Sequence, residues 1–232
     1  MKQQATANEL SKKTAAVKAV EYVEAGMKLG LGTGTTIRYF IEELAKRKMD
    51  VTCVPSSKAT ETLAKSLGLR VVSLNDALAG AKYGEIPQLN LCVDGADEAD
   101  KRMTLIKGGG GALMREKIIA SASKDFIVVI DETKWVDRVG KYPLPVEVLP
   151  FAQKFVESEI RELGGTPKIR EKFTTDNGNI ILDATGLDLS DALDMEGMLN
   201  NIPGVIENGI FAMRNADLVI LGRGKDFRIY EQ

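Results

Sequence analysis

The residues best suited to chemistry lie in the segment LCVDGADEADKRMTLIKGGGGALMREK, residues 91–117. One short apolar run ends in Asp94 and Asp97, and a second, 103–106, ends in Lys107 and four glycines. A helix-like segment then begins, with Glu116 about one turn inside it. Carboxylates, an ammonium group and bare amides therefore gather where two predicted strands stop and a helix starts. Ligands of open α/β sheets bind at that edge, so the segment indicates an active site for an anionic small molecule.

These residue types suit removal of a proton from a carbon beside a carbonyl group. Glu116 is the candidate base, because an ordinary glutamate is ionised near pH 7. Lys107 and the amides of the following glycines, 108–111, are candidates to stabilise the enediolate oxygen that becomes negative. Asp94 and Asp97 can hold sugar hydroxyls, and one of them could move a hydroxyl proton to open a ring.

Each of these residues also has a plainer interpretation. The two aspartates could cap a turn, and the glycines could form a flexible loop. Glu116 could belong to a solvated helical face together with Arg115 and Lys117. Lys134 could be surface charge, and Trp135 is best explained by packing. Their joint occurrence at predicted strand ends is what favours a site.

The turn GLGTGTT, residues 30–36, is a second candidate site. It joins a predicted strand, 27–31, to a predicted helix, 37–46, so free N–H groups and the helix dipole would point at an anion. Thr33, Thr35 and Thr36 add hydroxyl donors. The glycine spacing is not that of a dinucleotide-binding motif, and the ending of a P-loop is missing. We favour a phosphate cradle, with a structural tight turn as the alternative.

Composition excludes several classes of protein. The chain has 232 residues, a net charge of −2 and no histidine. A Ser-His-Asp or Cys-His nucleophile is therefore excluded, and Cys53 and Cys92 are too few for a zinc site. We therefore expect no metal. We also expect no nucleic-acid partner, because the net charge is not basic, and no membrane partner, because no apolar run reaches the ~18 residues of a membrane span. A polar N-terminus and two cysteines in apolar runs predict a cytoplasmic protein with buried, reduced thiols.

The order of predicted elements indicates two domains. Strands alternate with helices up to about residue 142, which is typical of a parallel sheet covered on both faces. After the proline-rich KYPLPVEVLP come strand 146–149, helix 151–163, strands 166–173 and 180–184, helix 190–200 and strand 205–213, which is a ferredoxin-like order. The apolar run 216–221 is expected to return to the first domain. We therefore predict an α/β protein with a Rossmann-like parallel-sheet domain, 1–142 and 215–232, and a smaller ferredoxin-like α+β domain, 143–214, inserted before the C-terminal strand.

Seven segments together resemble ribose-5-phosphate isomerase of the A type. They occur in order over nearly the whole chain: GLGTGTT, VDGADE, IKGGGGALMREK, DETKWV, GKYPLPVEV, TDNGNIILD and IPGVIENGIF. The resemblance implies an aldose–ketose isomerase of the non-oxidative pentose phosphate pathway, which interconverts ribose 5-phosphate and ribulose 5-phosphate through an enediol. It also implies that no cofactor is needed and that the chain forms a homodimer or a tetramer.

The resemblance assigns roles to particular residues. Phosphate contacts fall on Thr33, Gly34, Thr35 and Thr36, and further substrate contacts on Asp94, Gly95, Ala96 and Asp97 and on Lys107, Gly108, Gly109 and Gly110. Glu116 matches the catalytic glutamate and Lys134 a substrate-binding lysine. An N-terminal lysine near the phosphate falls on Lys12, although the adjacent Lys13 blurs the register. Gly111 replaces a common alanine, which should loosen the loop, and residues 79–90 look longer than in compact members.

Two rivals are a related enzyme and a non-catalytic module. A glucosamine-6-phosphate deaminase or a CoA transferase has a related fold, but the deaminase resemblance predicts a catalytic histidine, which this chain lacks. A module that senses sugar phosphates without turnover would need neither Glu116 nor Lys107.

Overall fold

The computed structural model describes residues 2–80 and 88–232, with side chains from residue 8 onward. The described chain divides into two compact units. The first unit contains Met1–Gly95, Arg115–Trp135 and Ala216–Gln232, and the second contains Ala96–Met114 and Val136–Asn215. This division groups 96–114 with the second unit, whereas the sequence-based prediction placed it in the first domain. The domain boundaries themselves stay a prediction. Of the segment 79–90 that looked long, residues 81–87 lie outside the described residues.

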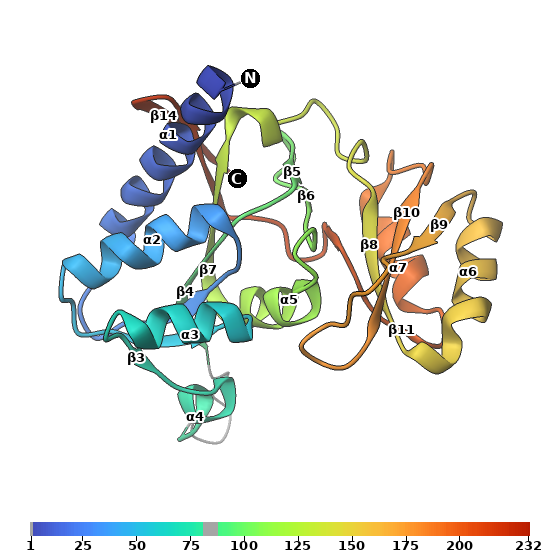
Figure 1. The fold of residues 1–232 in the computed structure, drawn as a ribbon, viewed down its shortest axis with the longest axis horizontal. Coiled ribbons are helices and arrows are strands. Elements are labelled where there is room, and N and C mark those ends of the chain that lie inside the picture. The colour runs from blue at the N-terminus through green and yellow to red at the C-terminus, as the bar shows by residue number, and fades with distance from the viewer. Residues whose placement is uncertain (1, 81–87) are drawn as a thin grey trace. The chain divides into compact units, whose positions relative to one another are not determined.

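The first unit is built on a seven-stranded sheet in the order β14-β13-β7-β4-β1-β2-β3. Figure 1 labels β14, β7, β4 and β3 of this sheet. All neighbouring strands are parallel except the final hairpin of β13 and β14. The predicted return of the chain to this sheet is confirmed, because Leu218 pairs with Ile127. The strands are β1 Lys28–Leu31, β2 Thr52–Pro55, β3 Arg70–Val71, β4 Leu89–Asp94, β7 Ser123–Asp131, β13 Leu218–Arg223 and β14 Asp226–Glu231.

Helices cover both faces of this sheet, as the apolar strand sequences predicted. Residues of α1, α2 and α3 pack in one core with the strand residues Leu29, Leu31 and Val93. The alternate strand residues face α5, and Gly30 is essential there, because a Cβ at Gly30 would lie 2.3 Å from Ile119 Cγ2. The helices are α1 Lys2–Ala19, α2 Thr35–Lys46, α3 Lys58–Ser66, α4 Leu74–Leu78 and α5 Leu113–Ser121, with short 3₁₀ turns η1 Val20–Tyr22 and η2 Glu132–Lys134.

The strand order contains a topological switch point between β1 and β4. From β1 the chain builds outward through β2 to β3, and from β4 it builds in the other direction through β7 to β13. Open α/β sheets bind ligands in the crevice outside the carboxyl ends of the strands at such a point. The loop after β1 and the end of β4, which carries Asp94, therefore occupy the expected binding position of this unit.

The second unit contains the predicted ferredoxin-like element order and an antiparallel sheet, β11-β8-β10-β9. Its core joins sheet residues such as Val146 and Leu182 to Val156 and Ile160 of α6 and Leu199 of α7. Together with the parallel sheet of the first unit, this confirms the predicted fold class. The elements are β8 Leu144–Val148, η3 Pro150–Ala152, α6 Gln153–Glu162, β9 Thr166–Ile169, β10 Ile180–Thr185, α7 Ala192–Asn200 and β11 Val205–Asn208.

A third, three-stranded sheet corrects two predictions. It has the order β12-β6-β5, with β5 Glu98–Ala99, β6 Leu105–Ile106 and β12 Ile210–Phe211. The apolar run before Lys107 is therefore not a strand of the parallel sheet, although the prediction placed it there. The predicted single strand 205–213 is also wrong, since the chain changes sheets at Gly209, whose N–H donates to the Pro145 carbonyl at 2.8 Å.

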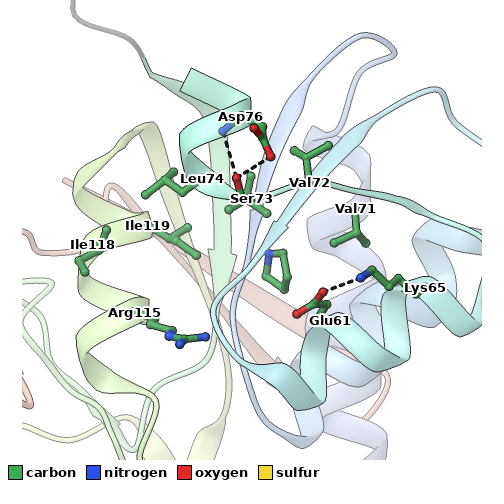
Figure 2. Close-up of a pocket in the computed structure, with 12 residues that line it drawn as sticks. Glu61, Lys65, Val71, Val72, Ser73, Leu74, Asp76, Arg115, Ile118 and Ile119 are labelled. Atoms are coloured by element: carbon green, nitrogen blue, oxygen red, sulfur yellow. Dashed lines mark hydrogen bonds and ion pairs between the residues drawn. The ribbon is translucent and has the colours of Figure 1, made fainter. Parts of the chain in front are cut away.

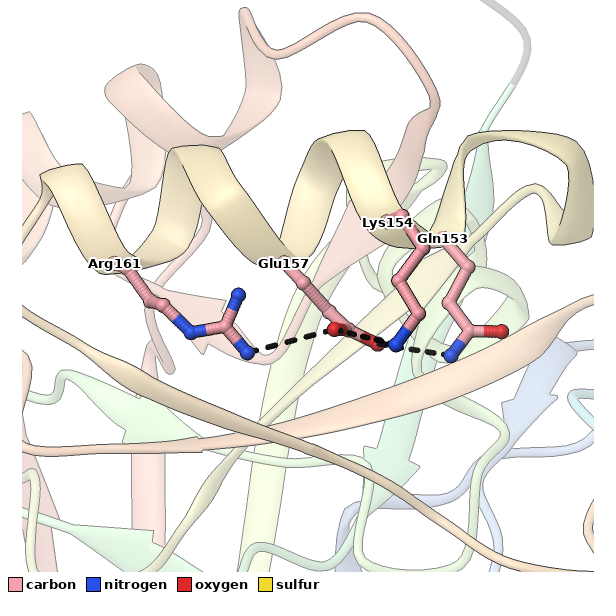
Figure 3. A network of polar contacts seen from close by, with 4 residues as sticks. All are labelled: Gln153, Lys154, Glu157 and Arg161. Carbon is pink, nitrogen blue, oxygen red and sulfur yellow. Dashed lines mark hydrogen bonds and ion pairs between the residues drawn. The ribbon is translucent and has the colours of Figure 1, made fainter.

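Helix α6 carries a polar network centred on Glu157 (Figure 3). Its carboxylate accepts hydrogen bonds from Gln153 at 2.8 Å, Lys154 at 3.0 Å and Arg161 at 3.4 Å. The Gln153 amide is the main cause that holds the pKa of Glu157 below its ordinary value of 4.5, and the two cations add to it. The contribution of this network to stability is therefore complete above about pH 4.5 and is lost as the pH falls through the lower, folded-state pKa.

We expect Glu157→Gln to destabilise α6 at pH 7 by about 0.5–1 kcal/mol, because helical pairs three or four residues apart contribute about 0.2–0.5 kcal/mol each. The difference from the unmodified chain should shrink toward pH 3. Amide hydrogen exchange of α6 at the two pH values measures this effect without assuming two-state unfolding. A difference that stays equal at both pH values would contradict an ionic contribution from Glu157.

Candidate active site

The loop after β1 rests directly on Asp94. Thr33 donates its N–H to Asp94 Oδ1 at 3.1 Å, and Gly95 donates its N–H to the same oxygen at 2.7 Å. A Cβ at Gly32 would lie 1.8 Å from that oxygen, so only glycine lets the loop approach so closely. Asp94 is 1% exposed. These contacts support the alternative that Asp94 caps a turn, because its carboxylate accepts the N–H groups of Thr33 and Gly95. The predicted contact of Asp94 with a sugar hydroxyl stays a prediction.

Helix α2 opens with backbone amides that no side chain caps. Gly34, at the N-cap position, has a φ of +111°, which favours glycine, and makes no side-chain cap hydrogen bond. Gly34 and Thr35 are exposed, and Thr36 is half-buried. The start of this 12-residue helix therefore presents oriented N–H groups to solvent. This geometry favours the predicted phosphate cradle over a turn with a purely structural role.

The side chain of Thr33 takes part in a cluster of hydroxyl groups that the sequence analysis missed. Its Oγ1 lies 2.9 Å from the hydroxyls of Ser56 and Ser57, and Thr60 Oγ1 donates to the Gly32 carbonyl at 2.8 Å. Ser57 is also the N-cap of α3 and accepts the Thr60 N–H. The Thr33 hydroxyl thus ties the cradle to α3, and the pair of serines just before α3 was the available signal in the sequence.

Lys12 rather than Lys13 lies toward the cradle helix. Lys12 Nζ is 2.8 Å from Glu9 Oε1, and the Tyr39 hydroxyl of α2 donates to the other Glu9 oxygen at 2.7 Å. The hydrogen bond from Lys12 is the main cause that lowers the pKa of Glu9, with that from Tyr39 second. Lys13 is exposed. The contacts favour Lys12 as the N-terminal lysine of the site.

Glu116 lies in the first turn of α5 and is 5% exposed, and Lys117 is 8% exposed. The alternative of a solvated helical face is therefore wrong. Arg115 instead lines a separate cavity of about 520 Å³ beside the carboxyl ends of β2 and β3. Figure 2 shows its guanidinium in that cavity, with Ile118 and Ile119 on the same wall. Neighbouring residues of α5 therefore lie in different surroundings: Arg115 lines this cavity, whereas Glu116 and Lys117 are buried.

Lys134 follows β7 in the short turn η2 and is half-buried. Asp131 starts this turn by accepting the Thr133 N–H at 2.9 Å. Trp135 stacks on Tyr230 of β14 with ring centroids 4.2 Å apart, which confirms the interpretation that it packs. The turn that carries Lys134 is therefore held at both ends, at the carboxyl edge of its strand.

In the second unit, Lys107 and the glycine loop follow β6. Lys107 is 3% exposed, and its ammonium lies 5.5 Å from the centroid of Phe211. Asp97 accepts the Gly109 N–H at 2.7 Å. A Cβ at Gly109 would lie 2.6 Å from the Tyr142 hydroxyl, so glycine is required at that position. Asp97 and the KGGG segment are thus brought together, as predicted for this half of the site.

Three further residues around this loop were given no role from the sequence: Tyr142 lies within the motif GKYPLPVEV, and Arg170 and Phe173 lie outside the seven motifs. Tyr142 lies beside Asp97, and burial first and that negative charge second raise the pKa of its phenol. Arg170 donates to the carbonyls of Gly108 and Gly109. Phe173 covers Gly111, where a Cβ would lie 2.2 Å from the ring at a φ of +75°. The expectation that Gly111 loosens the loop is therefore wrong, because the glycine is closely packed.

Two absences concern only the part of the chain that the structure describes. Among residues 2–80 and 88–232, no group of three or more acidic, cysteine or histidine side chains is placed to hold a metal ion. Within the same ranges, no helix has the length and hydropathy needed to cross a membrane. Both cysteines are buried and neither forms a disulfide, and burial raises the pKa of Cys53 to about 12.

Comparison with known proteins identifies the family. The family model of ribose 5-phosphate isomerase A (phosphoriboisomerase A) matches residues 52–226. The ribose-5-phosphate isomerase A of Acidithiobacillus ferrooxidans is 51% identical over 212 residues, which are 91% of this chain and 93% of that protein. The chain belongs to the ribose 5-phosphate isomerase A family. The predicted resemblance is therefore confirmed.

Solved structures of the ribose 5-phosphate isomerase A family share the fold. The enzyme from Neisseria gonorrhoeae aligns with a TM-score of 0.91 at 41% identity, covering 97% of both chains. A D-ribose-5-phosphate isomerase solved in complex with phospho-erythronic acid aligns with a TM-score of 0.89 at 40% identity, covering 96% of this chain and 98% of that one. The arrangement of strands and helices described above is thus that of the family.

Proposed function

We propose that the chain interconverts D-ribose 5-phosphate and D-ribulose 5-phosphate, with Glu116 as the base. Membership of the ribose 5-phosphate isomerase A family is the observation that carries the reaction, an aldose–ketose isomerisation. The roles of single residues are our proposal and draw on the local geometry of each unit. In this reaction a proton leaves C2 of the aldose and a proton is added at C1, through an enediolate.

The proposal divides the work among four groups. The open amides of α2, with Thr33, Gly34, Thr35 and Thr36, bind the phosphate, and Lys12 adds positive charge. Glu116 transfers the proton between the two carbons. Lys107 and the amides of Gly108 and Gly110 stabilise the enediolate oxygen. The predicted donors Gly109 and Gly111 are left out, because their N–H groups donate to Asp97 and to the Gly108 carbonyl. Asp94, Gly95, Ala96 and Asp97 contact the sugar, and Lys134 binds the substrate as a further cation.

An assay of the purified chain with ribose 5-phosphate, in buffer containing a metal chelator, tests the function. We expect ribulose 5-phosphate to form without any added cofactor. The alternative, a module that senses sugar phosphates, predicts binding of ribose 5-phosphate without product. Binding measured by calorimetry together with no turnover would therefore replace the proposed function by the alternative.

We expect Lys134→Ala mainly to raise KM, because a cation that contacts the bound substrate in its ground state contributes uniform binding. The loss of one charge-assisted hydrogen bond between Lys134 and the substrate corresponds to roughly a tenfold rise in KM. Steady-state kinetics measure both constants, with Lys124→Ala, a change to an exposed lysine on β7, as the control. If kcat falls while KM stays constant, Lys134 has a role other than substrate binding.

We also propose that the chain assembles as a homodimer or a tetramer in the cytoplasm. The second unit exposes Leu149, Phe151 and Phe155 at 43%, 96% and 50%, and large apolar side chains grouped on a surface often mark an interface. Two buried cysteines that form no disulfide fit a reducing compartment. Light scattering on the purified chain measures its mass, and fractionation of cells that express it tests the location.

A further inference from the structure

Arg170, which follows β9, holds the glycine loop by its backbone carbonyls. Its Nη1 donates to the Gly108 and Gly109 carbonyls at 3.2 and 3.1 Å. Its Nε and Nη2 donate to the two carboxylate oxygens of Asp183 on β10 at 2.9 and 2.5 Å. The guanidinium therefore has a fixed position, because a bidentate pair with a carboxylate allows one geometry. All these residues belong to the second unit.

The contacts of the loop fix the direction of its peptide groups. The peptide that joins Gly108 to Gly109 is held at both ends, its carbonyl by Arg170 and its N–H by Asp97. The Gly108 carbonyl also accepts the Gly111 N–H at 2.9 Å. In a trans peptide the carbonyl and the N–H point in opposite directions. Because the Gly109 carbonyl points to Arg170, the N–H of Gly110 points away from it, and Gly110 is exposed.

A loop of four glycines does not keep such an orientation by itself. Glycine has no Cβ and occupies positive and negative φ with similar ease. Rotation of the peptide between Gly109 and Gly110 would replace an N–H donor by a carbonyl oxygen, which repels a negative charge. Charge-assisted hydrogen bonds from a guanidinium are about twice as strong as neutral ones and select the orientation in which both carbonyls face Arg170.

We propose that Arg170, oriented by Asp183, is a positioning residue that keeps the N–H of Gly110 directed toward the enediolate oxygen of the substrate. This proposal rests on the proposed function, in which the loop amides stabilise that oxygen. Arg170 acts only through the loop and has no contact with substrate in this account. Its role requires the planar fork as well as the charge, so lysine should not replace it fully.

Kinetics of Arg170→Gln, Arg170→Lys and Asp183→Asn test the role in catalysis. We expect Arg170→Gln to lower kcat by about 10²–10³, the effect of losing one oxyanion donor, with KM within about threefold. Arg170→Lys and Asp183→Asn should show smaller losses of kcat of the same kind. Arg161→Gln is the matched control. Arg161 lies in the last turn of α6 in the same unit and forms an ion pair with Glu157, so the kcat of this variant should not change.

NMR of the unliganded protein, labelled with ¹⁵N at glycine only, tests the positioning without any use of activity. One set of loop signals is expected in the unmodified chain and in Arg161→Gln, and doubled or broadened loop signals in Arg170→Gln. Unchanged loop signals in Arg170→Gln would overturn the positioning role. Doubled signals with normal kcat would instead show that the loop amides are not the oxyanion donors, which is a failure of the proposed function. Asp183→Asn gives the same readouts if Arg170→Gln does not fold.

Discussion

Glu116→Gln should lower kcat by at least about 10³ and leave KM nearly unchanged. The substitution keeps the size and hydrogen-bonding shape of a side chain that is 5% exposed, so the fold of α5 should be retained. In the proposed function it removes the group that accepts the proton from C2, and a base acts mainly in the transition state. Steady-state kinetics with ribose 5-phosphate, in both directions, measure the effect.

Glu157→Gln provides the matched control for this experiment. Glu157 is also a helical glutamate of low exposure, but its carboxylate is bound by residues of its own helix. Its variant should have normal kcat and KM at pH 7. Near-normal turnover of Glu116→Gln would show that Glu116 is not the base. Exchange of the C2 proton of the substrate with solvent, measured in the same variant, would then test whether another group transfers that proton.

Lys107→Met should lower kcat by about 10²–10³, the range expected for loss of one group that stabilises an oxyanion. Methionine keeps an unbranched side chain of similar length beside Phe211, so the packing changes little while the charge is lost. If the proposed function holds, the chain should also bind phospho-erythronic acid, the compound present in the structure of a related isomerase. The affinity of Lys107→Met for that acid should then fall more than its affinity for ribose 5-phosphate, because the carboxylate carries the negative charge that the enediolate develops.

Lys154→Met serves as the control, since it removes a lysine of the same unit that pairs with Glu157. Its kcat and its affinity for phospho-erythronic acid should match those of the unmodified chain. Equal losses of affinity for the acid and for ribose 5-phosphate in Lys107→Met, with unchanged kcat, would mean that Lys107 provides uniform binding rather than stabilisation of the oxyanion.

Local sequence predicted the elements that dominate both units, because burial patterns and glycine turns are local properties. Apolar runs predicted the parallel strands, and β9 and β10, which pair antiparallel, fall within the predicted strands 166–173 and 180–184 of the second domain except for Thr185. The prediction failed where pairing partners decide the outcome. The run before Lys107 looked like a strand of the parallel sheet, but its residues pair with β12 and β5 in a separate sheet. Strand β14, Asp226–Glu231, was not predicted, and it pairs with the edge that β13 offers.

The sequence by itself determined the family, the fold class and the chemical types of the candidate site residues, because seven motifs and the lack of histidine can be read without coordinates. Only the tertiary structure decided which groups support them. Arg170 is 62 residues from Gly108 along the chain, and Thr60 is 28 residues from Gly32. Hydrogen bonds over such separations depend on how strands and loops pack in three dimensions, and neither the spacing nor the identity of these residues marks them in advance.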